Sequence, residues 1–319
     1  MKQYSHAWLA FMAIKRLEET TLSEADNTYA ASLVKWFKDH KDGVIQGAWY
    51  PDMIIKDMAT SHVLKFTPVK DGSKGSFRKL PGTYLIYKHC KNSDLKKCSY
   101  TVDKDTNLTD RCESIAHSVV DNLKMQTKER KGSPIAPNNN HLATILFMLS
   151  HYVADAHVPF HCDSRKFSKG KDIHGRLEDV WDDEIKKYFL LDKANERFFY
   201  DRHGYPLLDK EKELQYKDSF LKKVEDNLKK RKFSSSFGTG NNNVWDFMSA
   251  ICQHSYLLSY MFIPEGYDHT NVTTSNWTKL GGTDTDLEDL NIIVLCDAID
   301  SIAKVYFRVW RRFKRWKKD

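Results

Sequence analysis

The chain has 319 residues, of which 41% are hydrophobic and 13% aromatic, enough apolar material for a substantial core and too much for a disordered chain. Its formal net charge of +7 comes from 50 basic and 43 acidic side chains, which predicts mild attraction to phosphate-bearing partners and argues against a dedicated nucleic-acid binder. The opening residues have no apolar core of signal-peptide length and no later segment approaches roughly 18 uninterrupted apolar residues, so the chain as written predicts a cytoplasmic protein without a membrane span.

The pattern of apolar residues predicts a mainly α-helical chain. Apolar residues recur at helical spacing through 5–19, with Ser5 placed to cap them, so a buried first helix is expected there. Further helices are expected at 25–40, 110–130, 142–156, 176–190, 210–230, 244–262 and 287–315. The loop-like stretches 138–140 and 234–243 have neither the length nor the charge run of a linker, so we predict a single all-α domain over 1–319.

Residues 70–105 depart from this helical pattern. The stretches 82–87 and 98–102 are β-like and predict a small β-hairpin insertion. Two of the six cysteines, Cys90 and Cys98, lie where they could bridge such a hairpin, but in a cytosolic protein free thiols are favoured over a disulfide. The sequence contains no Cys-x-x-Cys pair, which disfavours zinc-finger and thioredoxin-type sites.

The C-terminal segment 287–319 ends in a dense run of basic and aromatic residues, from Val309 to Lys318. Such a run is able to lie on an anionic membrane surface. The interpretation we favour is a helix whose basic end suits its own dipole and whose aromatic side chains pack on the core.

Residues with metal-ligand chemistry are concentrated in one stretch, at His151, Asp155, His161, His174 and Glu178. The four-residue steps from His151 to Asp155 and from His174 to Glu178 put an imidazole and a carboxylate on one face of each predicted helix. A proline after the first pair ends that helix and turns the chain, so that His161 is able to return toward the same cluster. These spacings predict an open-sided site and make a zinc hydrolase the first hypothesis.

Three further candidate ligands lie upstream, at His6, Asp52 and His62. Neutral imidazoles and carboxylates are the ligands expected for zinc, and three carboxylates against three divalent ions leave a surplus of about three positive charges. Such a site attracts and polarises a phosphodiester. Closely spaced metal ions also lower the pKa of a bridging water and neutralise charge on the leaving oxygen.

The order and spacing of these residues resemble those of the bacterial zinc-dependent phospholipase C family, whose trinuclear zinc site sits in an all-helical domain. The same superfamily includes the fungal single-strand-specific zinc nucleases. The resemblance rests on His6, Asp52, His62, His151, Asp155, His161, His174 and Glu178. It extends from residue 1 to about residue 190, and beyond that point it is limited to helical character.

The resemblance implies a ligand set for each zinc ion. Asp52, His62, His151 and Asp155 would surround one zinc, and His161, His174 and Glu178 would hold a second. Asp155 would also bridge to a third zinc, held by His6 and by the amine and carbonyl of the first residue. In the family that residue is a tryptophan exposed by removal of a leader, whereas here it is Met1. Three zinc ions are therefore expected, or two if Met1 does not ligate.

Smaller signs favour the phospholipase branch of this superfamily over the nuclease branch. The pair His174 and Glu178 follows a short loop, and residues 178–188 resemble the phospholipase continuation. The nucleases have a longer loop with a Gly-Gly-Asn signature that ends in His-x-x-x-Asp. The triplet Tyr-Pro-Asp at 50–52 is phospholipase-like, while Val-Trp-Asp at 180–182 resembles the nucleases as well.

The resemblance thus implies a phospholipase C that cleaves phospholipid to diacylglycerol and a phosphorylated headgroup, with Asp52 as general base and Glu178 as the second candidate. The alternatives are a single-strand-specific zinc nuclease or nucleotidase and a non-catalytic zinc-stabilised interaction protein. The expected partners are a phospholipid or another phosphodiester and a peripheral membrane contact, with no stable protein partner. Members of the family are usually exported, which stands against the cytoplasmic location that the chain as written predicts.

Overall fold

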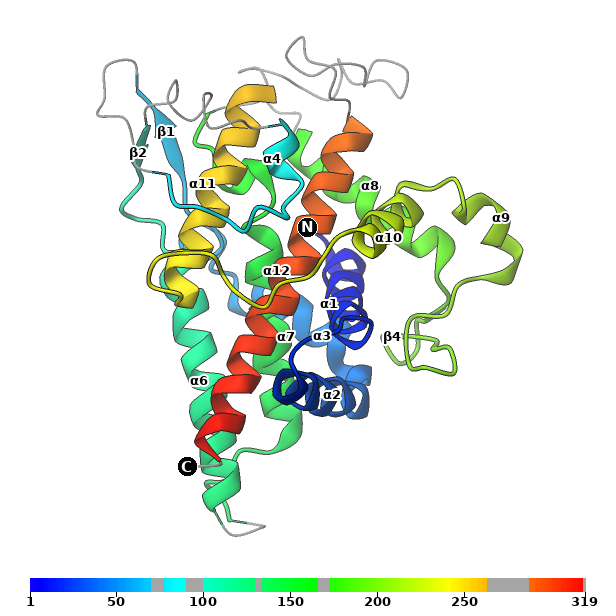
Figure 1. Ribbon diagram of the computed structural model, residues 1–319. Coiled ribbons are helices and arrows are strands. Elements are labelled where there is room, and N and C mark those ends of the chain that lie inside the picture. Colours follow the sequence, from blue (N-terminus) through cyan, green and yellow to red (C-terminus); the bar gives the residue numbers. More distant parts are fainter. Residues whose placement is uncertain (70–76, 90–99, 130–132, 166–172, 263–286, 318–319) are drawn as a thin grey trace.

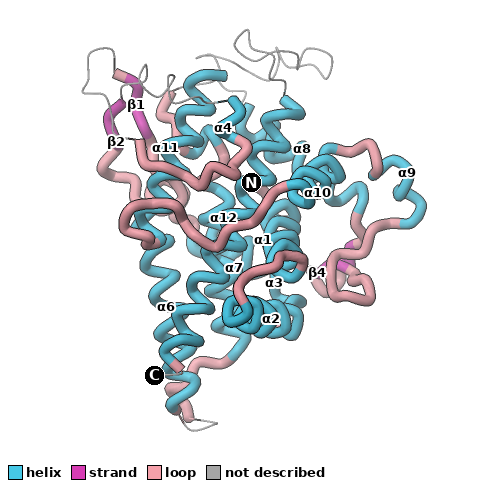
Figure 2. The backbone as a smooth tube through the Cα atoms, in the orientation of Figure 1, coloured by secondary structure: helices cyan, strands magenta, loops and turns pink. Residues whose placement is uncertain are grey.

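The computed structural model describes residues 1–69, 77–89, 100–129, 133–165, 173–262 and 287–317. Most of these residues are helical, which confirms the expected all-α class (Figure 2). The longer helices are α1 (Gln3–Glu18), α2 (Glu24–Asp39), α3 (Val44–Tyr50), α6 (Leu108–Lys128), α7 (Asn139–Asp155), α8 (Ile173–Tyr188), α10 (Phe220–Lys230), α11 (Val244–Phe262) and α12 (Leu287–Trp316). The shorter helical turns are η1 (Lys41–Gly43), η2 (Pro51–Ile55), α4 (Ile86–His89), η3 (Pro159–His161), η4 (Lys210–Lys212) and α9 (Glu213–Tyr216).

Helix α12 is the element around which the other long helices pack. It is the orange to red ribbon of Figure 1, and it contacts α1, α2, α6, α7 and α10. Apolar side chains at helical spacing, including Ile299, Ile302 and Tyr306, are fully buried along it. Buried apolar side chains on a helix with so many neighbours place α12 in the core.

Three of the helices begin at side-chain caps of the expected kind. Ser23, Asn138 and Ser219 precede α2, α7 and α10, and each side chain accepts a hydrogen bond from a backbone N–H in the first turn. The first helix starts earlier than predicted, so Ser5 lies inside its first turn and is not the cap. The Ser5 hydroxyl instead donates a hydrogen bond to the carbonyl of Lys2.

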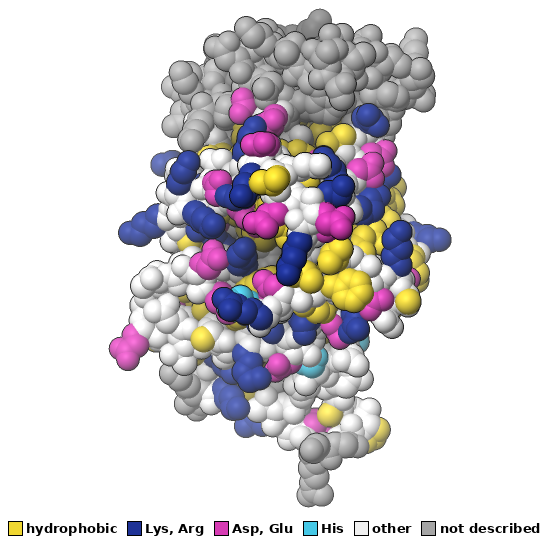
Figure 3. Space-filling view, turned by 90° about the vertical axis from the view of Figure 1, so that its right-hand side faces the viewer, with side chains coloured by type: hydrophobic (Ala, Val, Ile, Leu, Met, Phe, Trp, Pro, Cys, Tyr) yellow, Lys and Arg dark blue, Asp and Glu magenta, His cyan; other side chains and the backbone are white. Residues whose placement is uncertain are grey.

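Two small antiparallel sheets accompany the helices. Strand β1 (Phe66–Pro68) pairs with β2 (Tyr100–Val102), and β3 (Leu191–Asp192) pairs with β4 (Arg197–Phe198). The expected helix at 210–230 is divided into η4, α9 and α10, and α3 forms where no helix was expected. Strand β4 and α9 belong to an excursion on the right of Figure 1. Figure 3 faces that side and shows basic and acidic side chains interspersed, so this face does not present a single sign of charge.

The β-strand expected at 82–87 is wrong, because this segment leads into helix α4. The backbone N–H groups of Leu85 and Ile86 donate to the two carboxylate oxygens of Asp297 on α12, at 2.9 and 3.1 Å. A carboxylate that accepts from the first N–H groups of a helix stabilises its N-terminus. The other expected strand, at 98–102, is present as β2 from Tyr100, but its partner is β1, which lies before the expected insertion. The candidate disulfide residues Cys90 and Cys98 lie outside the described residues.

The C-terminal end of α12 packs its aromatic side chains against the core. Trp310 and Phe313 are 5% and 6% exposed, and the indole N–H of Trp310 donates to Ser32 Oγ at 2.8 Å. These contacts agree with the favoured interpretation of the basic segment, in which the aromatic side chains belong to the core. Among the described helices, none combines the length and the apolar character needed to cross a bilayer.

Helices α3 and α7 approach each other closely, and this contact positions the candidate site. A Cβ atom at Gly47 would lie 2.9 Å from Cδ2 of Phe147, so only glycine fits between the helices at this spacing. The carbonyl of the next residue, Ala48, accepts a hydrogen bond from His151 Nδ1 at 2.7 Å. Helix α3 continues directly into η2, which carries Asp52, so this contact sets the distance from that carboxylate to α7.

Candidate metal centre

The predicted ligands reach one region from α1, η2, α7, η3 and α8, together with the loop after η2. The two helical pairs form as expected, because His151 Nε2 lies 3.1 Å from Asp155 Oδ2 and His174 Nε2 lies 2.7 Å from Glu178 Oε1. His161 on η3 returns to this cluster, with its Nε2 atom 2.7 Å from Nε2 of His174. The chain therefore turns after α7 and brings His161 back toward the other candidate ligands, as the sequence predicted.

The potential ligand atoms fall into three groups, in each of which the atoms lie within 4.8 Å of one another. The groups are His6, His151 and Asp155; Asp52, His62 and His151; and His161, His174 and Glu178. The first two groups share His151. Every side chain that the sequence predicts as a ligand belongs to one of them.

The imidazoles of His62 and His151 meet with their Nε2 atoms 2.9 Å apart. The Nδ1 atom of His62 lies 2.7 Å from a carboxylate oxygen of Asp57, and Nδ1 of His151 lies 2.7 Å from the carbonyl of Ala48. Because the carbonyl oxygen of Ala48 only accepts, Nδ1 of His151 carries a proton. The two Nε2 atoms face each other, and a cation bound between them would be stabilised by both rings.

Two carboxylates complete this group. The Oδ1 atom of Asp52 lies 3.2 Å from His62 Nε2 and 3.5 Å from His151 Nε2. Burial lowers the pKa of His151, but Asp155 and Asp52 outweigh it and raise that pKa to about 9, so a proton on His151 supplies the cation in the metal-free protein. A zinc ion would take the place of this proton, and the side chains around it are the set that the resemblance implies for the first zinc.

Asp155 lies between the groups, with its two oxygens facing different partners. Its Oδ2 atom faces His151, while Oδ1 lies 3.4 Å from His6 Nε2 and 3.1 Å from the Met1 amine. Neither ring nitrogen of His6 makes a hydrogen bond, although the ring is buried. A buried imidazole without hydrogen bonds carries a desolvation cost that metal binding would offset. These contacts suit the bridging role that the resemblance implies for Asp155.

The amine of Met1 is buried between two carboxylates. It donates to Asp155 Oδ1 at 3.1 Å and to Glu178 Oε1 at 2.5 Å. Burial lowers the pKa of this amine, but the two carboxylates outweigh it and raise the pKa to about 10. Because an amine binds a metal only after losing its proton, a third zinc would have to displace the proton that now holds these carboxylates together.

Two imidazoles and two carboxylates of the cluster are in the protonation states that a metal requires. Burial lowers the pKa of His6 and of His161, so both imidazoles are neutral at pH 7. For Asp155 and Glu178, burial acts to raise the pKa, but the Met1 amine and nearby histidines outweigh it and hold both values well below the usual range. Neutral imidazoles and ionised carboxylates are the forms that bind zinc.

Asp57 is a functional candidate that the sequence did not reveal. Its Oδ1 atom is 2.7 Å from His62 Nδ1, and its two oxygens accept from the hydroxyl of Tyr152 at 3.2 and 3.1 Å. A carboxylate close to a metal-binding imidazole helps to orient the ring. Asp57 lies in a turn, where its spacing from His62 has no periodic meaning, so no sequence signal pointed to it.

The cluster comes nearest to solvent along one edge. The side chains of Asp52, Glu178 and His174 are 12%, 11% and 27% exposed, whereas the other ligand imidazoles are almost completely buried. Aromatic rings pack against the ligands: the ring of Phe160 stacks on His174 with centroids 5.7 Å apart, and the ring centroid of Trp49 lies 6.5 Å from that of His151. The candidate centre is therefore buried on its inner side and accessible to solvent along the edge formed by Asp52, His174 and Glu178.

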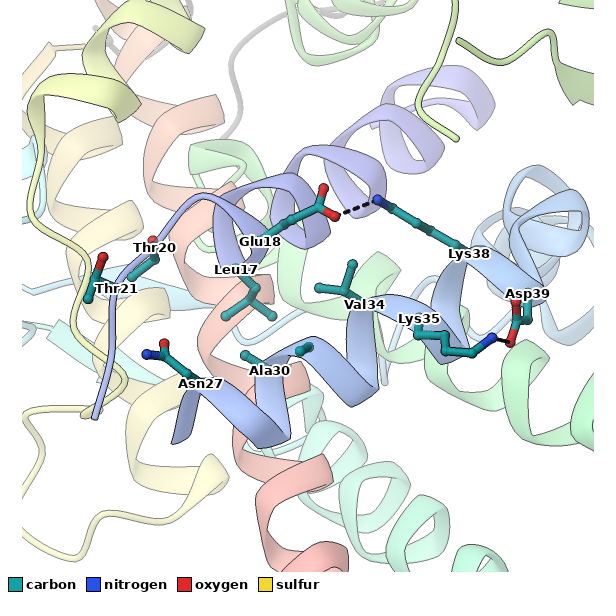
Figure 4. A pocket seen from close by; sticks show the side chains of 11 residues that line it. Leu17, Glu18, Thr20, Thr21, Asn27, Ala30, Val34, Lys35, Lys38 and Asp39 are labelled. Carbon is teal, nitrogen blue, oxygen red and sulfur yellow. Dashed lines mark hydrogen bonds and ion pairs between the residues drawn. The ribbon is translucent and has the colours of Figure 1, made fainter. Parts of the chain in front are cut away.

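A separate pocket of about 620 Å³ lies between the end of α1 and α2 (Figure 4). Its charged side chains pair with each other, Lys38 with Glu18 at 2.7 Å and Lys35 with Asp39 at 2.9 Å. No predicted ligand lines it, and Glu18 lies about 18 Å along α1 from His6 at the usual helical rise. This pocket is therefore distinct from the metal cluster.

No protein-family model and no curated protein matches the sequence. Among solved structures, the chain is similar to alpha toxin from Clostridium absonum, with 13% identity, a TM-score of 0.48, and coverage of 97% of this chain and 64% of that one. It is also similar to Clostridium perfringens alpha-toxin isolated from avian strain SWCP, with 14% identity, a TM-score of 0.45, and coverage of 98% and 63%. The chain thus spans less than two thirds of the length of these toxins. What supports a function for it is the geometry of its ligands together with the motifs of its sequence.

Proposed function

We propose that this chain is a zinc-dependent phosphodiester hydrolase that acts on phospholipid, releasing diacylglycerol and a phosphorylated headgroup. The observation that carries the proposal is the group of Asp52, His62 and His151. In this group two imidazole nitrogens face each other at 2.9 Å, with a carboxylate oxygen 3.2 Å from one of them. Such a group would stabilise a cation, and imidazole with carboxylate is a ligand set that suits zinc.

Zinc bound here would lower the pKa of a coordinated water and offset the negative charge of the phosphate. Asp52 is the proposed general base. Burial acts to raise the pKa of its carboxyl, but contacts with His151 and His62 outweigh it and hold that pKa below the usual range. Ionised and partly exposed, the carboxylate accepts the proton of the attacking water. Glu178, which contacts His174 and the Met1 amine, is the second candidate for this role.

Two features favour phospholipid over single-stranded nucleic acid as the substrate. The pair His174 and Glu178 has the spacing and the terminal glutamate of the phospholipase branch. In addition, the rings of Phe160 and Trp49 pack against ligand imidazoles, whereas a nuclease of this kind would use aromatic side chains beside the metal to stack bases.

The test is an assay of zinc-loaded protein on vesicles of phosphatidylcholine, phosphatidylethanolamine or phosphatidylinositol and, separately, on single-stranded DNA. We expect release of phosphorylated headgroup from at least one vesicle type, its loss with a chelator, and its return with added zinc. Zinc-dependent degradation of the DNA without lipid hydrolysis would support the nuclease alternative. Stoichiometric zinc without either reaction would support a zinc-stabilised interaction protein.

The role of Asp52 has its own test. Asn at position 52 keeps the size of the side chain and removes its ability to take a proton. We expect the Asp52→Asn variant to lose hydrolysis by at least about 100-fold. Zinc content per chain is measured in parallel, since Asp52 is also a predicted ligand. Full turnover with full zinc content would show that Asp52 is not the base and would turn attention to Glu178.

A further inference from the structure

Large apolar side chains are exposed immediately after Asp52. Met53, Ile54, Ile55 and Met58 are 57%, 57%, 37% and 50% exposed. We call residues 53–58 the apolar turn. Single exposed apolar side chains are ordinary, but several on one short turn form a patch that marks a contact surface.

The apolar turn has a fixed base. It follows the buried Pro51, whose carbonyl accepts from the N–H of Lys56 at 2.7 Å, and Lys56 has a left-handed backbone with φ of 56°. At the other end, Asp57 is held by the hydroxyl of Tyr152 and by His62. Because the chain is anchored on both sides, the side chains between the anchors are held out toward solvent and away from the core.

We propose that the apolar turn inserts into the surface of a phospholipid bilayer and so brings the metal cluster to the lipid headgroups. The inference rests on the proposed function and names the physical form of its substrate, a lipid within a membrane. Partial insertion of a few apolar side chains, with a cation beside them, is the usual way in which a protein lies on a bilayer. The exposed Lys56 supplies that cation at the level of the phosphates.

The position of the apolar turn favours a bilayer over a protein partner. The turn begins next to Asp52, which lies on the accessible edge of the cluster, so whatever covers the turn also approaches that edge. A protein seated there would obstruct the substrate. A bilayer would supply it, since the bilayer contains the phosphodiester itself.

The test uses the double variant Ile54→Ser with Met58→Ser, which spares the residue next to Asp52. A matched control, Ile135→Ser with Leu214→Ser, removes two side chains that are 63% and 77% exposed on elements without ligands. Binding to phosphatidylcholine vesicles is measured by co-sedimentation. Hydrolysis is measured on those vesicles and on a short-chain phosphatidylcholine kept below its micelle concentration, and zinc content is measured for each protein.

We expect the Ile54 and Met58 variant to lose vesicle binding and vesicle hydrolysis by at least about tenfold. Its zinc content and its hydrolysis of the monomeric lipid should stay within about twofold of the starting protein, and the control should behave as the starting protein on both substrates. The two rates on the same variant therefore separate membrane contact from chemistry.

Other outcomes overturn the inference or the function separately. Unchanged vesicle binding and hydrolysis in the variant would refute the membrane role of the apolar turn while leaving the hydrolase proposal intact. If the zinc-loaded starting protein hydrolyses none of phosphatidylcholine, phosphatidylethanolamine and phosphatidylinositol, the phospholipase proposal is refuted, whatever vesicles the protein binds. If sedimentation shows a dimer that the variant alone dissociates, with vesicle binding unchanged, the turn is a contact between two copies.

Discussion

Two buried groups of charged side chains differ in how their charges are satisfied. One group is a network along α12 in which guanidinium groups face carboxylates. It comprises Arg16, Arg231, Asp297 and Asp300. Arg16 Nε donates to Asp300 Oδ1 at 3.0 Å, and Arg231 Nη2 lies 2.9 Å from Asp297 Oδ1 and 3.0 Å from Asp300 Oδ2. In the metal cluster, by contrast, imidazole nitrogens lie against each other and against carboxylates, with a proton on His151 in the metal-free protein. The α12 network pairs guanidinium groups with carboxylates, although Nε and Nη1 of Arg231 make no hydrogen bond, whereas the cluster gathers imidazole nitrogens around carboxylates.

The difference shows that burial of charge does not by itself identify a functional site. Both groups are buried, and both contain carboxylates in close contact with nitrogen-bearing side chains. What separates them is the chemistry of their nitrogen atoms: a guanidinium only donates hydrogen bonds, whereas an imidazole nitrogen without a proton is able to bind a metal.

The largest expected effect comes from the centre of the metal cluster. We expect Asp155→Asn to lower zinc-dependent kcat/KM by about a thousandfold or more, because it removes negative charge from the side chain that faces His151, His6 and the Met1 amine. Zinc per chain should fall as well. The control is Asp183→Asn, an exposed carboxylate on α8. Hydrolysis within tenfold of the starting protein at full zinc content would contradict the assignment.

The next effect belongs to the α12 network and should appear in stability, not in zinc binding. We expect Asp300→Asn to lower the free energy of unfolding by about 3 to 5 kcal/mol, because it leaves the buried guanidiniums of Arg16 and Arg231 short of a counter-charge. Urea unfolding measures the change. Zinc stoichiometry of the folded protein should not change, and a loss of zinc in this variant would mean that the two regions are coupled.

A smaller effect is expected where the metal cluster meets its surroundings. Asp57→Asn should weaken zinc binding by about 10- to 100-fold, because an amide orients the Nδ1–H of His62 less strongly than a carboxylate does. A competition titration with a zinc-binding dye measures the affinity. Thermal unfolding of the metal-free variant should match that of the metal-free starting protein. Equal zinc affinity in the two proteins would show that Asp57 has no role at the metal centre.

The smallest effect is expected at His254, which lies outside both regions, and it concerns how the free energy of unfolding depends on pH. Burial lowers the pKa of His254 to about 4, despite the hydrogen bond from its Nδ1 to the carbonyl of Ala250. Because the folded value lies below the ordinary value of about 6.5, this group weakens the fold as the pH falls from 6.5 toward 4. His254→Gln should reduce the slope of unfolding free energy against pH in that window by up to about 1.4 kcal/mol per unit. An unchanged slope would show that His254 titrates normally.

The sequence predicted those parts of the fold and site that depend on local geometry. The pairs at 151 and 155 and at 174 and 178 follow from helical spacing, and the helices that carry them were placed within a few residues. Their meeting with His6, Asp52 and His62 came only from the order of residues in a known family, because it depends on how separate elements pack.

Other features could not be read from the sequence because distant residues determine them. The helical start at Leu85 and Ile86 depends on Asp297, more than 200 residues away, which is why a strand was expected there. The α12 network likewise joins Arg16 to Asp300. Asp57 acquires its role from a loop conformation that places it against a histidine.

The glycine contact between α3 and α7 has a mechanical consequence. Asp52 follows α3 and His151 lies on α7. The size of the residue at position 47, between these helices, therefore affects the distance between the two side chains. A single methyl group at this position would push α3 and α7 apart and so increase the distance between Asp52 and His151. If the proposed centre binds an ion, the residue at position 47 would therefore affect the size of ion that fits without lying among the candidate ligands.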